Sequence, residues 1–150
     1  MKKIALKIRL MQADDFAAVI QIDQKVLQVS RPDYYKLKFE ELVQSTDRLP
    51  TSLVAEDEKG VVVGFVMGEL FIGQYGISQE ATLDTIGVDP DFQHQGVGRQ
   101  LLQEFMDHLK ALGARKIKTL VDSADTRMMH FFQANRFTPS KTVNLEYSLG

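Results

Sequence analysis

The sequence contains no cysteine, and its formal net charge is only −2. The first absence excludes disulfides, thiolate metal sites and a cysteine nucleophile. The near-neutral charge gives no global reason to expect nucleic acid or a membrane surface as a partner. No apolar run approaches the roughly 18 residues of a membrane-spanning helix. Lys7 and Arg9 interrupt the first apolar run too early for a signal peptide. We therefore expect a cytoplasmic protein.

Histidine is also scarce, and the three histidines show no spacing typical of a metal site, so no metal is expected. What the chain does have is 150 residues of which 44% are hydrophobic, which favours a single domain spanning residues 1–150 around one core. Apolar periodicity predicts strands at residues 4–9, 51–56, 61–71, 81–88, 117–121 and 143–149, and helices at residues 14–27, 34–43, 96–112 and 126–135. This order indicates an α/β fold with a sheet of mixed direction. Between the second and third strands, Asp57-Glu58-Lys59-Gly60 predicts a hairpin turn in which Gly60 is available for positive φ.

The most informative stretch runs from Ala81 to Leu102, where a strand leads into a glycine-containing loop and then directly into a long amphipathic helix. Backbone N–H groups at such a junction lack partners within the helix, and the helix dipole adds partial positive charge. Glycine at positions 96 and 98 leaves room for phosphate oxygens to approach the amides. The segment therefore predicts a phosphate cradle, although a glycine pair by itself is equally typical of an ordinary turn.

Two nucleotide-binding motifs do not fit this loop. A Walker loop needs Gly-Lys-Ser/Thr, whereas Gly98 is followed by Arg99 and Gln100. A dinucleotide fingerprint needs a third glycine where the chain has Leu101. The phosphate ligand must then be of another kind.

The run Gln93-His94-Gln95-Gly96-Val97-Gly98 matches a Gln/Arg-x-x-Gly-x-Gly/Ala signature. By this signature, and by the strand and helix around it, the chain resembles the GNAT N-acetyltransferase superfamily, with a coenzyme-binding segment similar to that of ribosomal-protein alanine N-acetyltransferases. The resemblance is specific over residues 82–137. It implies a mixed, largely antiparallel sheet flanked by helices, with splayed central strands. It also implies acetyl transfer from acetyl-CoA, as co-substrate, to a primary amine on a small molecule or a protein.

The resemblance also assigns coenzyme contacts. Backbone groups on the strand before the loop would pair with the pantetheine arm, amides of the loop would hold the pyrophosphate, and two positions after the loop would complete the site. The positions are Ile86, Gly87, Val88, Gln93, His94, Gln95, Gly96, Val97, Gly98, Arg99, Asp125 and Phe132. Asp125 stands where many relatives carry asparagine, and an aspartate can accept the same hydrogen bonds but cannot donate them.

The catalytic side chains depart from the resemblance. Phe132 replaces a tyrosine that protonates the leaving thiolate, and Leu120 replaces a glutamate base. Asp84, inside an apolar strand, is the remaining candidate for the general base, and strand alternation predicts that it faces the same side as Ile86 and Val88. The amide of Val88 is the implied oxyanion donor. Tyr75, on the loop at residues 73–79, is a candidate acid.

Without a cysteine, direct attack of the amine within a ternary complex is the expected route. The resemblance places the acceptor site at residues 21–39 and 73–79, and it allows a homodimer. Two alternatives remain. The chain could be a catalytically degenerate module that binds acetyl-CoA for a regulatory or partner-binding role, or an α/β domain with no coenzyme site.

Overall fold

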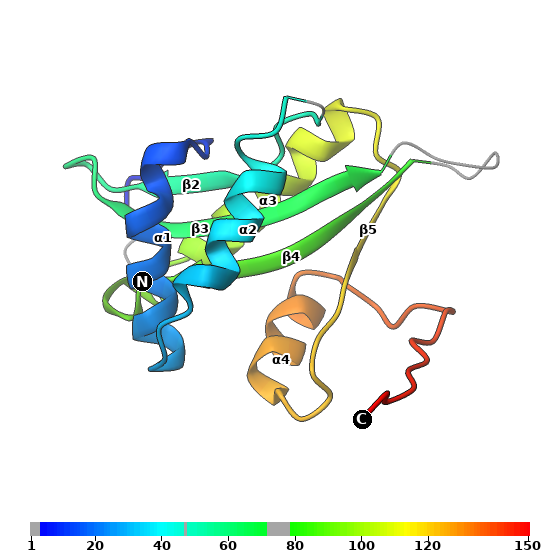
Figure 1. The fold of residues 1–150 in the computed structure, drawn as a ribbon. Coiled ribbons are helices and arrows are strands. Elements are labelled where there is room, and N and C mark those ends of the chain that lie inside the picture. Colours follow the sequence, from blue (N-terminus) through cyan, green and yellow to red (C-terminus); the bar gives the residue numbers. More distant parts are fainter. Residues whose placement is uncertain (1–3, 47, 72–78) are drawn as a thin grey trace. The chain divides into compact units, whose positions relative to one another are not determined.

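A computed structural model describes residues 4–46, 48–71 and 79–150. These residues form two compact units, divided after Leu120. The first unit holds the sheet and three α-helices, and the second holds a short helix and the C-terminal segment (Figure 1).

The described part of the first unit contains one five-stranded sheet whose strands lie side by side in chain order. Neighbours are antiparallel from the first strand to the fourth, and the fourth and fifth are parallel. The predicted mixed, largely antiparallel sheet is therefore confirmed. The strands are β1 (Lys7–Leu10), β2 (Leu53–Glu56), β3 (Val62–Phe71), β4 (Glu80–Val88) and β5 (Lys116–Thr119).

Helices cover both faces of this sheet (Figure 1). On one face lie α1 (Phe16–Leu27), which follows the 3₁₀ turn η1 (Ala13–Asp15), and α2 (Pro32–Leu42). The other face carries α3 (Val97–Ala111), which follows the 3₁₀ turn η2 (Pro90–Phe92). All three α-helices begin and end within two residues of the predicted limits, because each carries an apolar stripe at helical spacing.

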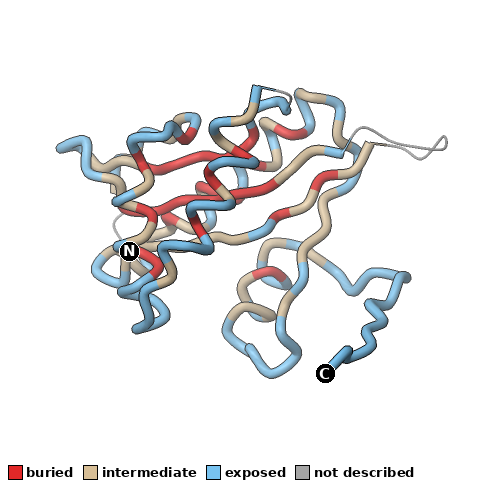
Figure 2. Tube along the Cα trace, in the orientation of Figure 1, coloured by how far each residue is buried: buried red, intermediate tan, exposed pale blue. Residues whose placement is uncertain are grey.

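The core lies between the sheet and the helices, where buried residues line β2, β3 and the inner helix faces (Figure 2). On the α1/α2 face, Tyr35 and Phe39 pack in one cluster with Phe65 and Met67 of β3. On the α3 face, a Cβ added at Gly64 would lie 2.8 Å from Leu101 Cδ1. Glycine thus allows α3 to pack closely on the sheet beside the predicted cradle.

The β2–β3 turn confirms a local prediction. Gly60 has φ +80°, a left-handed conformation that glycine adopts without steric cost. Asp57 supports the turn, because its carboxylate accepts hydrogen bonds from the amides of Lys59 and Val61.

In the second unit, Asp125 is the N-cap of α4 (Thr126–Ala134). Its carboxylate accepts a hydrogen bond of 3.1 Å from the amide of Met128. Phe132 is buried, with its ring centroid 5.2 Å from Phe131 and 5.1 Å from Phe137. The prediction of a strand at residues 143–149 is wrong in this structure, which has no strand there. Its apolar residues alternate, but a strand also needs a partner to complete its hydrogen bonds, and their side chains are exposed.

Candidate functional site

β5 pairs with only the first part of β4. They pair only from Glu80 to Leu83, and the hydroxyl of Thr119 donates to the carbonyl of Leu83 where the pairing ends. From Asp84 to Val88, no other strand in the described part of the chain pairs with this edge of β4. The first unit therefore has an open strand edge within its sheet, as the resemblance implied for the splayed strands.

The backbone groups of this edge point outward at alternate residues. The amide of Asp89 donates to the carbonyl of Val63 at 2.8 Å, so Asp89 faces inward toward β3. Because hydrogen-bonding direction alternates along an antiparallel strand, Val88 and Ile86 direct their N–H and C=O groups to the open edge. These are the two residues predicted to pair with an extended ligand.

A β-bulge interrupts β4 at Asp84. Met67 of β3 pairs with Thr85, and the next residue, Gly68, pairs with Leu83, so Asp84 is the extra residue. The bulge turns the Asp84 side chain toward α2, where its carboxylate accepts a hydrogen bond of 3.0 Å from Lys38 Nζ.

The predicted facing of Asp84 is therefore wrong. Val88 pairs with Gly64, which packs against α3, whereas Asp84 contacts α2 on the opposite face. The cause is the extra residue, because each inserted residue shifts the alternation of the strand by one position. The side chain of Asp84 is only 22% exposed although the residue as a whole is exposed, so its main chain is the part that reaches solvent.

Beyond the open edge, the loop from Asp89 to α3 has the backbone of an anion cradle. His94 has φ +64° and Gly96 has φ +82°. Just before the helix, two residues in the left-handed conformation therefore alternate with residues outside it. Successive amides in such an arrangement turn inward around an anion. The Cβ position of Gly96 is open, because the nearest atom outside its chain neighbours, Gln100 Nε2, lies 4.0 Å away. α3 then adds the N-terminal amides of a 15-residue helix.

The start of this loop is tied to α1. Asp89 accepts from the amide of Asp91 at 3.0 Å and from Lys25 Nζ at 2.9 Å. The hydrogen bond and charge of Asp89 raise the pKa of Lys25 above its ordinary value, so the ion pair persists at neutral pH. Lys25 was not among the predicted site residues, because nothing local to α1 identifies a partner 64 residues away.

A buried polar cluster supports the α1–α2 side of the site. The Asp23 carboxylate receives two hydrogen bonds from Arg31, of 2.7 and 3.0 Å, and one of 2.8 Å from the Tyr35 hydroxyl. Burial, together with the hydrogen bond to Asp23, raises the pKa of Tyr35 above its ordinary value. The ring of Tyr34 lies beside two cations, with its centroid 4.6 Å from Arg31 Cζ and 5.6 Å from Lys38 Nζ. This cluster fixes the face of α2 that meets Asp84.

Other predicted site residues lie elsewhere. Tyr75 falls outside the described residues, as does most of its loop. Asp125 and Phe132 belong to the second unit, where one caps α4 and the other packs among aromatic rings. Within the described ranges, no group of three His, Asp or Glu side chains could hold a metal ion, and no helix is long and apolar enough to cross a membrane.

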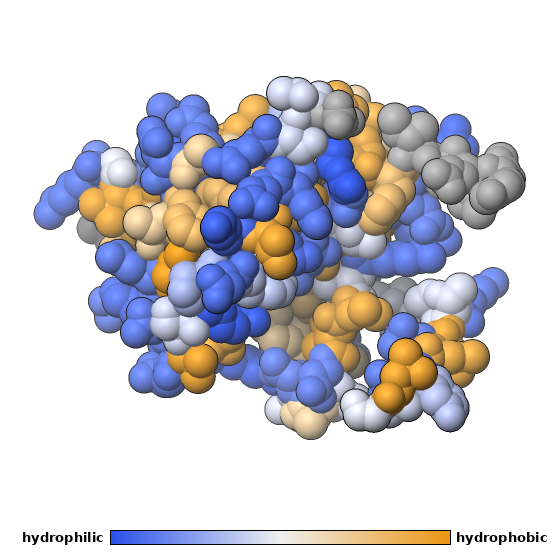
Figure 3. Space-filling view, viewed as in Figure 1, coloured by the Kyte–Doolittle hydropathy of each residue, from blue (hydrophilic) through white to orange (hydrophobic). Residues whose placement is uncertain are grey.

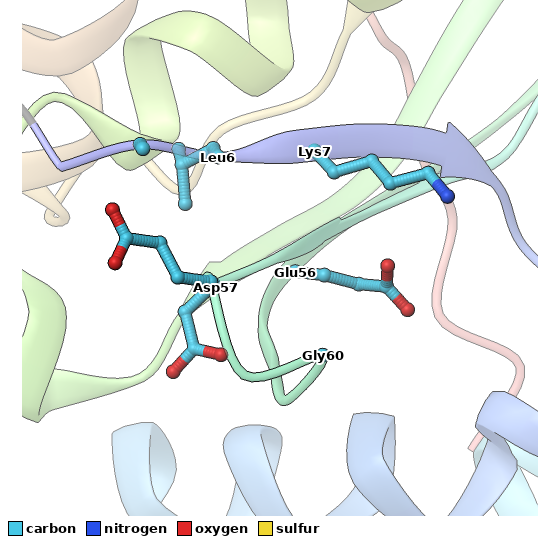
Figure 4. Close-up of a pocket in the computed structure, with 7 residues that line it drawn as sticks. Leu6, Lys7, Glu56, Asp57 and Gly60 are labelled. Carbon is cyan, nitrogen blue, oxygen red and sulfur yellow. The ribbon is translucent and has the colours of Figure 1, made fainter.

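A hollow of about 340 Å³ lies at the β1 edge of the sheet, on the far side from β4 and β5. Lys7, Glu56 and Asp57 are among its lining residues (Figure 4). Glu56 is engaged by Arg9 at 3.0 Å, and Asp57 organises the β2–β3 turn. This hollow is therefore separate from the cradle and is built from groups with structural roles.

Residues 16–137 match the sequence profile of the Acetyltransferase (GNAT) family. The match includes the open strand, the cradle and α3. The chain belongs to the GNAT acetyltransferase family. This confirms the resemblance found in the sequence.

Curated relatives of this GNAT protein align over part of their length. A mycothiol acetyltransferase of Propionibacterium freudenreichii subsp. shermanii is 34% identical over 90 residues, which cover 60% of this chain and 28% of the relative. The ribosomal protein bS18-alanine N-acetyltransferase of Escherichia coli K12 is 32% identical over 71 residues, or 47% of each chain. The GNAT chain thus spans less than half the length of these two relatives.

Solved structures agree with the GNAT fold over nearly the whole chain. An aminoglycoside N-acetyltransferase in complex with CoA has a TM-score of 0.78 at 21% identity, covering 99% of this chain and 98% of that one. The ribosomal-protein-S18-alanine N-acetyltransferase of Escherichia coli has a TM-score of 0.74 at 22% identity, covering 91% and 80%. At these identities the likeness establishes the fold.

Lys38 of this GNAT protein was likewise not among the predicted site residues. A signal was present, because Tyr34 and Lys38 are four residues apart on one face of α2, and Arg31 directly precedes the helix. That spacing identifies a cationic face but not the strand residue it meets.

Seen over α1 and α2, the surface is mainly hydrophilic with scattered apolar patches (Figure 3).

Proposed function

We propose that this chain transfers the acetyl group of acetyl-CoA to a primary amine by direct attack within a ternary complex. One observation carries the proposal: the open edge of β4 leads without interruption into the anion cradle at the start of α3. An extended arm with a pyrophosphate at one end needs a strand edge and an anion site in this order. The named relatives act on amines as different as an aminoglycoside and a protein alanine, which supports an amine acceptor.

The residues present fit acetyl-CoA. Amides at residues 94–99 would hold the pyrophosphate, because the predicted amide of Gln93 already donates to the carbonyl of Pro90. The outward groups of Ile86 and Val88 would pair with the arm. Gly96 has no side chain, so the amides of the loop stay accessible to a phosphate group. Arg99 is exposed on the first turn of α3, where its charge would favour a phosphate group.

The chemistry requires an unprotonated amine, a stabilised oxyanion and a proton for the leaving thiolate. The amides of Val88, the predicted oxyanion donor, and of Ile86 both point to the open edge, the orientation that such a donor needs. Asp84 is the proposed base, placed beside the same edge by the bulge. Holding the two reactants together supplies much of the acceleration, because positioning alone contributes up to roughly 7–11 kcal/mol.

One observation favours a second function. Phe132, at the position of the tyrosine acid, is packed between two other rings and carries no proton to donate. A chain that binds acetyl-CoA without turning it over would then be a regulatory or partner-binding module. The two functions differ in turnover, which a screen of primary amines measures as release of the coenzyme thiol.

The first test is thermal unfolding with acetyl-CoA, free coenzyme A or ATP. A ligand at about 100 times its dissociation constant stabilises the native state by about 2.7 kcal/mol. For a domain of this size the melting temperature should rise by roughly 5–10 °C with acetyl-CoA. ATP should produce no comparable rise. An unchanged melting temperature at saturating acetyl-CoA would contradict both functions.

A further inference from the structure

The side chain of Lys38 is a primary amine that lies beside Asp84, the proposed general base, where an acceptor amine would have to lie. Its Nζ lies 3.0 Å from the Asp84 carboxylate and 5.6 Å from the centre of the Tyr34 ring. A carboxylate and an aromatic face are the two groups that together recognise an alkylammonium. The side chains of Lys38 and Asp84 are 25% and 22% exposed, so solvent only partly screens this pair.

The open edge directs the reactive end of acetyl-CoA to the same place. An arm that starts at the cradle and follows β4 backward passes Val88 and then Ile86. It can go no further than Asp84, because β5 occupies the edge from Leu83 onward. Asp84 is two residues from Ile86 and four from Val88, distances of roughly 7 and 13 Å along the strand. The outward amide of Ile86 is therefore the oxyanion donor within reach of Lys38, because the flexible four-carbon stem of lysine allows Nζ to leave the carboxylate and move roughly 7 Å along this edge.

We propose that Lys38 is a self-acetylation site, which occupies the position of the acceptor amine and takes the acetyl group from the chain's own acetyl-CoA. This inference rests on the proposed function, since acetyl-CoA must bind at the cradle. Lys36 offers an internal comparison, because it lies on the exposed side of the same helix.

The reaction balances without a further reactant. Lys38 loses a proton through Asp84 to solvent, and its nitrogen lone pair attacks the thioester carbon. The C–N bond forms and the C–S bond breaks, the nitrogen loses its second proton to become an amide, and the departing thiolate takes up that proton as free coenzyme A. The acetylated side chain carries no charge, so its ion pair with Asp84 is lost and the carboxylate becomes available to another amine.

The electrostatic surroundings make this reaction slow and dependent on pH. Burial lowers the pKa of Lys38, but the hydrogen bond and charge of Asp84 outweigh it, with smaller contributions from Tyr34 and Glu41 of α2. The net pKa is above the ordinary lysine value, so the reactive free amine is scarce at neutral pH. Its fraction increases about tenfold for each pH unit below that pKa. We expect acetylation over hours, faster at pH 9 than at pH 7.

The test incubates the full chain with acetyl-CoA and quantifies acetylation of Lys38 and Lys36 by peptide mass spectrometry. We expect Lys38 to be modified at least tenfold faster than Lys36, and the fraction of Lys38 acetylated per hour should not change when the protein is diluted at saturating acetyl-CoA. The Gly96→Glu variant, with its cradle blocked, should lower Lys38 to the rate of Lys36. The Gly60→Glu variant serves as control, because Gly60 has a similar φ but lies in the β2–β3 turn.

A second measurement uses no acetyl donor. Reductive methylation of Lys38 should slow severalfold when free coenzyme A is added, while Lys36 is unaffected. Absence of this protection would overturn the inference, as would equal acetylation of the two lysines or a fraction acetylated per hour that increases with protein concentration. If acetyl-CoA raises the melting temperature but Lys38 is not preferred, only the self-acetylation fails. If the melting temperature does not change, the proposed function fails as well.

Discussion

Tyr35 donates its hydroxyl hydrogen to Asp23 across 2.8 Å, in a part of the core where Tyr35 is 0% and Asp23 is 6% exposed. This bond, with the two from Arg31, leaves the carboxylate of α1 fully engaged by α2. The two helices are therefore held in one register beside the bulge of β4.

We expect Tyr35→Phe to lower the free energy of unfolding by about 1–3 kcal/mol, because it removes one donor from a buried carboxylate. Urea denaturation followed by circular dichroism measures this loss. Tyr34→Phe is the matched control, since Tyr34 is 36% exposed and its change should stay within about 0.5 kcal/mol. Equal effects of the two substitutions would contradict a stabilising role for the Tyr35–Asp23 bond.

Gly96→Glu should abolish binding of acetyl-CoA while the protein remains folded. The substitution places a carboxylate in the cradle, where it competes with phosphate for the same amides. Gly60→Glu carries the same strain, because both glycines have a left-handed backbone. Calorimetric titration with acetyl-CoA should give no measurable heat for the first variant and an unchanged dissociation constant for the second. Binding by Gly96→Glu would show that the cradle lies elsewhere.

Asp84→Asn should lower the rate of acetyl transfer roughly 10²-fold or more, because an amide cannot accept the proton of the amine. Binding of acetyl-CoA should be unaffected, since the proposed contacts of β4 are backbone groups. The measurement is thiol release with an amine found in the screen. Asp107→Asn, on the exposed side of α3, is the control and should retain the full rate. A fully active Asp84→Asn variant would remove Asp84 from the mechanism.

Asp15 should make stability depend on pH. Burial raises the pKa of Asp15. Hydrogen bonds from Arg9 and from the Gln12 amide, together with the charge of Arg9, lower this pKa by more than burial raises it, so the net pKa is below the ordinary value. The unfolded chain binds this proton more readily, so Asp15 stabilises the fold fully above about pH 4 and loses this effect as pH falls through its folded pKa.

Asp15→Asn should therefore cost about 1–3 kcal/mol at pH 7, and the difference from the unsubstituted chain should shrink below pH 4. Urea unfolding at several pH values measures both quantities. Asp14→Asn is the matched control, because Asp14 is exposed beside it. A penalty for Asp15→Asn that stays constant down to pH 2 would contradict the assigned pKa direction.

The sequence by itself determined the features that depend on neighbouring residues. The apolar stripe of α3, the left-handed Gly60 and the strand–loop–helix around Gly96 are all set within a few residues, so their patterns predicted them correctly. The family could be recognised for the same reason, since its signature occupies six consecutive positions.

The tertiary structure alone decided where Asp84 points and what it meets. A bulge arises from how two strands pair, and no local pattern shows which residue of β4 is the extra one. Lys38 reaches Asp84 across 46 residues of chain, a contact that only the packing of α2 on the sheet creates. The alternation at residues 143–149 gave a strand pattern without a strand, because strand formation requires a partner that the sequence of the segment does not contain.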